Sequence, residues 1–200
     1  MSTSGSSPSF RSAAADSPLL DDAALVARVQ TGDLDAFEIL VRSWAKALVS
    51  FASALLRSEA DGEEVVQDLF VWIWDHRFEW QPQGPLGAYL FRSVRNRAVS
   101  RLRHEQVEER FHQRLAGTTS PLSRPAESPD QAIAADELSA AIDAAIANLS
   151  DRCREVFLLS RQQGLTYSQV ADTLQISVKT DEIHMTRALA GLRQALGEWM

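Results

Sequence analysis

The chain has 200 residues, of which 45% are hydrophobic, so it can bury one large core or two small ones and is not wholly disordered. Its single cysteine, Cys153, excludes a disulfide framework and fits a reducing cytosol, and the lack of any run near eighteen apolar residues argues against membrane insertion. The net charge of −7 is unevenly distributed: residues 21–70 hold ten acidic and four basic residues, whereas residues 81–104 hold five arginines and no acid. This separation predicts two partners, one with a basic surface and one that is a polyanion.

Apolar residues recur at helical spacing through most of the chain, and no alternating strand pattern is convincing, which predicts an all-α fold. Residues 1–20 have the Ser, Ala, Gly and Pro content of a disordered tail. The pattern predicts a long helix at 35–56, an acidic helix at 61–76, a loop at 77–85 and a basic helix at 86–104. Residues 105–130 are predicted to form an acidic linker. We therefore expect two small helical domains, 21–104 and 131–200, joined by a flexible linker.

The acidic helix has one apolar and one polar face. Its inner stripe consists of Val66, Leu69, Phe70 and Ile73. The opposite face carries Glu64, Gln67, Asp68 and Val71. Acids on a surface helix commonly form a solvated face, but Val71, Trp72 and Trp74 add more apolar surface than one inner stripe requires. This face is therefore a candidate docking surface for a basic helix.

The basic helix has an inner stripe of Leu90, Val94, Ala98 and Leu102, which five arginines surround: Arg92, Arg95, Arg97, Arg101 and Arg103. Arginines on solvated helices are normally balanced by carboxylates, and their absence from residues 81–104 predicts contact with phosphate. Phe78, Trp80 and Tyr89 lie just upstream, where aromatic rings suit stacking with unpaired bases. The alternative is that these rings belong to the core.

Residues 165–192 have the pattern of a helix-turn-helix. Thr166 and Gln169 predict a capping box, and Ser177 caps the second helix after a short turn. The expected inner face of that second helix is Val178, Asp181, Met185, Ala188 and Leu192. The expected DNA-facing positions are Lys179, Thr180, Ile183, Thr186 and Arg187, with Glu182 and His184 on the flanks.

The order of these parts resembles the extracytoplasmic-function (ECF) group of bacterial RNA polymerase sigma factors, over about residues 22–196. The segment "GDLDAFEILVRSW" resembles the group's opening helix, "DGEEVVQDLFVWIW" its polymerase-binding segment, and "RFEWQPQGPLGAYLFRSVRNRAVSRLR" its promoter-melting segment. The segment "LSDRCREVFLLSRQQGLTYSQVADTLQISVKT" resembles its C-terminal domain, especially in the branch tied to iron-uptake signalling.

The resemblance implies a cytoplasmic protein that binds core RNA polymerase, recognises and melts promoter DNA, and initiates transcription of a specific regulon. The implied polymerase-binding residues are Glu64, Gln67, Asp68 and Val71. The implied minus-ten residues are Phe78, Trp80, Tyr89, Arg92, Arg95, Asn96, Arg97 and Arg101. The implied minus-thirty-five residues are Lys179, Thr180, Ile183, His184 and Arg187. An anti-sigma factor usually masks both domains in this group, and the acidic linker with Glu105, Glu108, Glu109, Glu127 and Asp130 would run through the polymerase's template and exit path.

The chain departs from the group's pattern at a few positions. Tyr89 stands where Trp is common and Ser100 where Asp is frequent, while Glu182 and Ile183 replace a basic and a small polar residue. Asp181 replaces a usual Val on the inner face, where a carboxylate is costly unless it is paired. Residues 149–200 also hold six acids and six bases, so we expect weak minus-thirty-five binding by this domain alone.

Two other interpretations stay open on the sequence. One is a helix-turn-helix regulator that binds DNA without polymerase, and the other is an adaptor that binds no DNA and sequesters a basic partner. An enzyme is not expected, since the chain has no Gly-rich phosphate loop and no Ser/His/Asp set. No cofactor or metal is expected either, because His184 lacks a Cys or His at i+3 or i+4 and Cys153 is far away in sequence.

Overall fold

The computed structural model describes residues 22–116 and 133–197. The N-terminal half contains α1 (Asp22–Gln30), α2 (Leu34–Leu56), α3 (Glu59–Asp75) and α4 (Leu86–Ala116). The C-terminal half contains α5 (Ile133–Ala147), α6 (Asp151–Phe157), a π-helical turn (Leu158–Gln162), α7 (Tyr167–Leu174) and α8 (Val178–Ala195). Neither described range contains a strand, so the all-α prediction is confirmed. The predicted tail at 1–20 and the linker from 117 to 130 lie outside the described residues.

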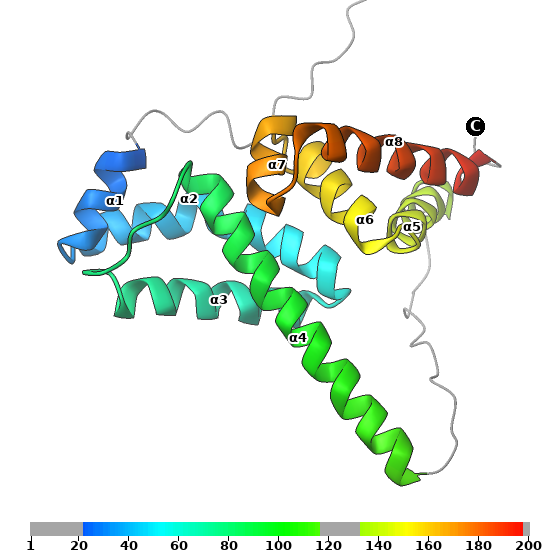
Figure 1. The fold of residues 1–200 in the computed structure, drawn as a ribbon, viewed down its shortest axis with the longest axis horizontal. Coiled ribbons are helices and arrows are strands. Elements are labelled where there is room, and N and C mark those ends of the chain that lie inside the picture. Colours follow the sequence, from blue (N-terminus) through cyan, green and yellow to red (C-terminus); the bar gives the residue numbers. More distant parts are fainter. Residues whose placement is uncertain (1–21, 117–132, 198–200) are drawn as a thin grey trace, which may run out of the picture.

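Helix α2 is the centre of the N-terminal half, where α1, α3 and α4 pack around it (Figure 1). Its buried face includes Leu40, Leu48, Phe51 and Leu55. By length and composition alone α2 is apolar enough to cross a membrane. Its contacts with α3 and α4, however, are those of the core helix of a folded domain.

Local signals in the sequence fix the ends of α2 and α3. The Asp33 side chain caps α2 by accepting a hydrogen bond from Ala36 N at 3.0 Å, and its hydrogen bond with Arg28 lowers the pKa of Asp33 from its usual value. Ser58 caps α3. Gly62 then lets α3 approach α2 closely, because a Cβ at this position would lie 2.7 Å from Ser53 N.

Helix α4 runs to Ala116, although the sequence predicted that the linker would begin at residue 105. The prediction was wrong here because it relied on the change in charge, whereas no Gly or Pro interrupts the chain between residues 88 and 116. Arg101 also pairs with Glu105 one turn later, which supports the continued helix. The C-terminal part of α4 projects away from the other helices (Figure 1).

The C-terminal half contains the predicted helix-turn-helix, formed by α7 and α8. The Thr166–Gln169 capping box begins α7, Gln175 ends it in the left-handed conformation with φ 55°, and the Ser177 side chain caps α8. The buried Arg154 guanidinium donates to the carbonyls of Ile146, Ala147 and Leu149, and so satisfies the C-terminal end of α5.

Candidate functional site

The outer surface of α3 has two ridges with different surroundings. One ridge, Glu63, Gln67 and Val71, lies beside α2. The other, Glu64, Asp68 and Trp72, lies beside the arginines of α4. The predicted inner stripe of the acidic helix is buried, and the predicted polymerase-binding residues are exposed, with Val71 at 53%. These four residues nevertheless belong to different ridges, which the linear pattern did not separate.

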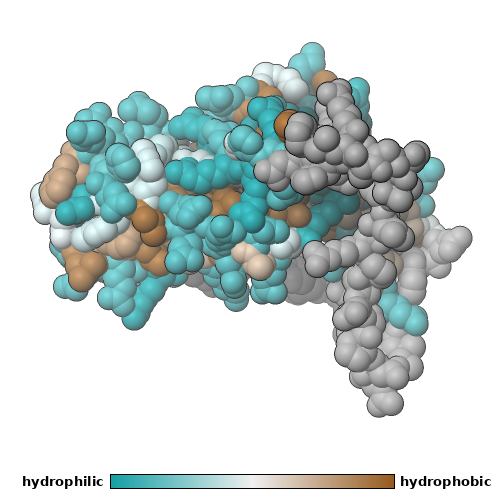
Figure 2. All heavy atoms as spheres, turned by 90° about the horizontal axis from the view of Figure 1, so that it is seen from below, coloured by the Kyte–Doolittle hydropathy of each residue, from teal (hydrophilic) through white to brown (hydrophobic). Residues whose placement is uncertain are grey.

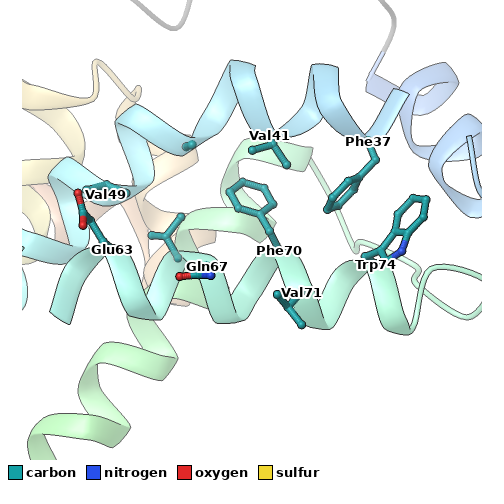
Figure 3. A pocket seen from close by; sticks show the side chains of 10 residues that line it. Phe37, Val41, Val49, Glu63, Gln67, Phe70, Val71 and Trp74 are labelled. Carbon is teal, nitrogen blue, oxygen red and sulfur yellow. The ribbon is translucent and has the colours of Figure 1, made fainter. Parts of the chain in front are cut away.

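An apolar groove of about 510 Å³ lies between α2 and α3. Figure 3 shows Phe37 and Val41 of α2 facing Phe70 and Trp74 of α3. From α2 come Phe37, Val41, Ala45 and Val49, and from α3 come Glu63, Val66, Gln67, Phe70, Val71 and Trp74. In the space-filling view, hydrophobic patches interrupt the hydrophilic surface on the side of the N-terminal helices (Figure 2). An open apolar groove with one acid on its edge suits the apolar face of a partner helix.

The arginines of α4 are less free than their sequence indicated. Arg101 donates to Asp61 at 2.5 Å and to Glu64 at 2.6 Å, and it also pairs with Glu105. The hydrogen bond with Glu64 raises the pKa of Arg101 above its usual value. The expectation that these arginines have no balancing carboxylate is therefore wrong for Arg101, because its acids come from α3 and from the next turn of α4.

Arg95 is also paired, in this case with the C-terminal half. Its Nε donates to Glu155 Oε1 at 2.8 Å, and its Nη1 donates to Asn96 Oδ1 at 3.3 Å. The Arg97 guanidinium lies 5.7 Å from the centre of the Trp72 ring, and burial lowers the pKa of Arg97. Arg92 lies over the Tyr89 ring and has no carboxylate partner among the described residues.

The loop at 77–85 carries two aromatic residues, of which one is buried in the core and the other is exposed. Trp80 is only 2% exposed, its ring lies 6.1 Å from that of the half-buried Tyr89, and its carbonyl accepts a hydrogen bond from Gln30. The prediction that Trp80 stacks on an unpaired base is therefore wrong, because this ring anchors the loop in the core. Phe78 is 67% exposed, and the Arg77 guanidinium lies over its ring, 4.4 Å from the ring centre.

On α8, the outward positions match the prediction. Lys179, Ile183, Thr186 and Arg187 are exposed, and together with Glu182 they line a shallow hollow. Thr180 is half-buried and helps to cap the helix, since its amide donates to Ser177 Oγ at 3.1 Å. The prediction that Val178 belongs to the inner face is wrong. Val178 is 43% exposed, because it occupies the first position of the helix, beyond the packed face.

The structure places His184 beside Cys153, although the two residues are 31 positions apart in the sequence. Its Nδ1 lies 3.8 Å from the Sγ of the buried Cys153, which α6 contributes. His184 is half-buried, so it lies at the edge of the exposed face of α8. Within residues 22–116 and 133–197, no cluster of three His, Cys, Asp or Glu side chains is suited to hold a metal ion.

Asp181 is fully buried on the inner face of α8, as predicted. Neither carboxylate oxygen has a hydrogen-bond partner among the described residues. Burial raises the pKa of Asp181 to about 6, and the nearby charge of Glu182 adds to this rise. The helix-turn-helix therefore carries an uncompensated acid in its core.

Comparison with known proteins places this geometry in a family. The model of Sigma-70 region 2 matches residues 40–107, and that of Sigma-70 region 4 matches residues 139–192. The ECF RNA polymerase sigma factor SigK of Mycobacterium sp. (strain KMS) is 30% identical over 176 residues, covering 86% of this chain and 89% of the relative. The chain is an ECF sigma factor. It therefore initiates transcription as a subunit of RNA polymerase, and its two matched regions lie one in the N-terminal and one in the C-terminal half.

Other similarities agree with this membership of the ECF sigma factors. CnrH of Cupriavidus metallidurans is 30% identical over 182 residues, covering 88% of this sigma factor and 94% of CnrH. The structure of CnrH in complex with the cytosolic domain of CnrY superposes with a TM-score of 0.65 at 28% identity, over 87% and 96% of the two chains. RpoE of Bartonella quintana, solved with the anti-sigma factor NepR, shares the fold, with a TM-score of 0.61 at 23% identity over 80% and 96% of the chains.

Sequence reasoning missed several residues of this sigma factor that the structure brings into the groove or into contact between the two halves. The groove residues of α2, Phe37 and Val41 among them, received no role beyond the predicted helix at 35–56. The signal that could have revealed them is that α2 has more apolar residues than one buried face requires. Glu155 and Arg57 were missed because their partners lie 60 and 90 residues away in the sequence.

Proposed function

We propose that residues 21–104 of this sigma factor bind core RNA polymerase and the minus-ten element, and that residues 131–200 bind the minus-thirty-five element. The observation that carries this division is that exposed apolar and acidic residues gather on α2 and α3, whereas the exposed basic and polar residues of α8 face away from its core. The segment between the domains would serve as the linker along the polymerase's template and exit path.

Core polymerase would bind at the groove and at both ridges of α3. Gln67 and Val71 line the groove, while Glu64 and Asp68 offer carboxylates beside it. A basic amphipathic helix can place apolar side chains in the groove and its cations against these acids. An anti-sigma factor that presents a similar helix would compete for the same surface, as expected from the family.

Promoter DNA would contact two separate faces. Phe78, Tyr89, Arg92, Arg95, Asn96, Arg97 and Arg101 are the candidates for the opened minus-ten strand, with Phe78 as the exposed ring for stacking. Trp80 would act only by positioning the loop. Lys179, Thr180, Ile183, His184 and Arg187 are the candidates for the minus-thirty-five element, read in the major groove.

The cellular setting follows from this role. The protein would act in the cytoplasm as a DNA-binding initiation factor and not as an enzyme, under the control of an anti-sigma factor. The likeness of its C-terminal segment to the iron-uptake-signalling branch supports a regulon for iron acquisition. Transcript levels after iron limitation, in cells with and without the gene, test this finer assignment.

Run-off transcription with core polymerase, followed by sequencing of the transcript starts, tests the proposed function. Val71→Arg should abolish transcription and co-elution with core polymerase without lowering the melting temperature, since Val71 is exposed. Arg187→Ala should weaken minus-thirty-five binding but leave co-elution intact. Glu38→Gln is the control, because Glu38 forms an exposed ion pair with Arg42 and lines neither the groove nor the hollow on α8. Normal transcription by Val71→Arg would exclude the groove as the polymerase site.

A further inference from the structure

The exposed face of α8 carries one acid among its proposed DNA contacts. A hollow of about 380 Å³ on this face is lined by Lys179, Glu182, Ile183, Thr186 and Arg187. These residues follow one another at intervals of three, one, three and one, which places all five on one side of the helix. The sequence pattern predicted Glu182 on the flank of the face, but the structure places it among the lining residues. A duplex held by this face therefore meets the carboxylate of Glu182.

No cation neutralises the Glu182 side chain within the part of the chain that the structure describes. None of the ion pairs there includes Glu182, Lys179 or Arg187. Thr186, one turn further on, donates its hydroxyl proton to the backbone carbonyl of Glu182 at 2.8 Å, so this proton is not available to the carboxylate. Glu182 is exposed, and its neighbour Ile183 is apolar and 44% exposed. The carboxylate is thus a free hydrogen-bond acceptor.

A free carboxylate has few partners on a DNA duplex. Phosphate repels it, and most groups that the bases present in the major groove are acceptors: N7 and O6 of guanine, N7 of adenine and O4 of thymine. The donors are the amino groups of cytosine and adenine. Adenine holds its amino group beside the N7 acceptor, whereas cytosine has no acceptor on this edge. Cytosine is therefore the base that suits a carboxylate, and a carboxylate desolvated opposite guanine or thymine would lack a hydrogen bond.

The position of Glu182 along α8 suits such a contact. In a helix-turn-helix, the N-terminal residues of the second helix reach the base edges. Glu182 is the fifth residue of α8, which begins at Val178. The two cations of the hollow lie on either side of it in the sequence, Lys179 before it and Arg187 after it. These cations can bind phosphate or guanine and so hold the helix in the groove, while the acid discriminates between bases.

We propose that Glu182 is a specificity-determining residue of this sigma factor, which selects a cytosine in the minus-thirty-five element by accepting a hydrogen bond from its N4 amino group. The inference rests on the proposed function, which assigns the exposed face of α8 to this element. Glu182 acts mainly by rejecting guanine and thymine, whose acceptors would face the carboxylate. It raises the ratio of specific to non-specific binding although its charge adds no affinity for the DNA backbone.

Two substitutions of Glu182 separate base reading from charge. Glu182→Gln keeps the size of the side chain and adds an amide that suits N6 and N7 of adenine, so the preferred base at one position should change from cytosine to adenine. Glu182→Ala should lower discrimination at that position by at least about fivefold and keep it elsewhere. Asp172→Asn is the matched control, because Asp172 is an exposed acid of α7 and its loss changes the net charge by the same amount.

Selection from a randomised library measures the base preference. Core polymerase with the full-length sigma factor binds duplexes that carry a mapped start site and a randomised upstream element, and the bound fraction is sequenced. Wild type and Asp172→Asn should retain a cytosine at one position, where Glu182→Gln should enrich adenine. Unchanged preferences in both Glu182 variants would overturn the proposal. A uniform change of affinity for all sequences would also overturn it, because charge or stability alone has that effect.

Run-off transcription separates this inference from the proposed function. Transcription by wild type from a defined upstream element, together with unchanged base preferences in the Glu182 variants, would remove the role of Glu182 and leave the function in place. Absence of transcription by wild type, or of any base preference in the upstream element, would remove both.

Discussion

Replacing Asp181 with valine should stabilise the C-terminal domain, although most substitutions in a core destabilise a protein. The carboxylate is fully buried, and neither oxygen has a hydrogen-bond partner among the described residues. Valine has a similar shape and needs no partner. Met185 and Ala188, which share the inner face, already provide an apolar setting.

The magnitude follows from the pKa of Asp181, which burial raises from 3.8 to about 6. Each tenfold change in proton affinity is worth about 1.4 kcal/mol, so the ionised carboxylate weakens folding at neutral pH by about 3 kcal/mol. Asp181 lies in the first turn of α8, where the interaction of its charge with the helix dipole offsets only about 0.3–1 kcal/mol of this cost. For a chain of this size, about 3 kcal/mol corresponds to a rise of roughly 6–12 °C in melting temperature.

The sign of the pH dependence distinguishes this cause from a general gain in packing. Because the pKa is higher in the folded than in the unfolded protein, the contribution of Asp181 to stability is greatest below pH 4 and is lost as the pH rises through about 6. The advantage of Asp181→Val should therefore be small near pH 4 and reach its full value above pH 7. Chemical denaturation at a series of pH values measures it.

An exposed acid of the same half provides the control. Asp172→Asn removes an exposed charge from α7, so it should change the melting temperature little. Asp181→Val should also raise affinity for the minus-thirty-five element, because it removes a negative charge from α8, the helix proposed to bind this element. An unchanged melting temperature, or an advantage that does not vary with pH, would refute the burial argument.

Three further outcomes are expected. Trp80→Ala should destabilise the N-terminal domain by about 3–5 kcal/mol in chemical denaturation, because Trp80 is a core residue and not a free stacking ring. Gly62→Ala should cost about 1–3 kcal/mol in the same assay, since its Cβ would meet the backbone of Ser53, and a normal stability would contradict the close packing of α2 and α3. Asp33→Ala should cost about 1 kcal/mol through loss of the N-cap of α2, while Asp35→Ala, in the first turn of the same helix but not at its cap, should cost less.

The parts of the fold that depend on neighbouring residues could be predicted from the sequence. Ser58, Thr166 and Ser177 mark helix starts because each side chain accepts a hydrogen bond from an amide three residues on. The burial of Asp181 also follows from helical spacing alone. Loop 77–85 was recognisable by its Pro and Gly content.

The parts that depend on contacts between helices could not be predicted in this way. Whether Trp80 faces solvent or core depends on α1, whose Gln30 binds the Trp80 carbonyl from 50 residues away. The pairing of Arg101 with Asp61 and Glu64 spans 40 and 37 residues, and no local rule gives such a register. The sequence therefore showed that acidic and basic residues lie on separate helices, but not that these residues form ion pairs with each other.

The ion pairs between α3 and α4 show that the separated charges partly neutralise each other in the free protein. Arg101 joins the ridge proposed for polymerase to the face proposed for DNA, through Glu64 and Asp61. A basic helix of polymerase that binds Glu64 would weaken the hold on Arg101, and a guanidinium released beside the opened strand gains a phosphate in exchange. If these proposed roles hold, binding of one partner would favour binding of the other, because each would replace a contact that the free protein makes with itself. An acidic protein can in this way keep a low affinity for stray DNA and still present arginines to DNA once polymerase is bound.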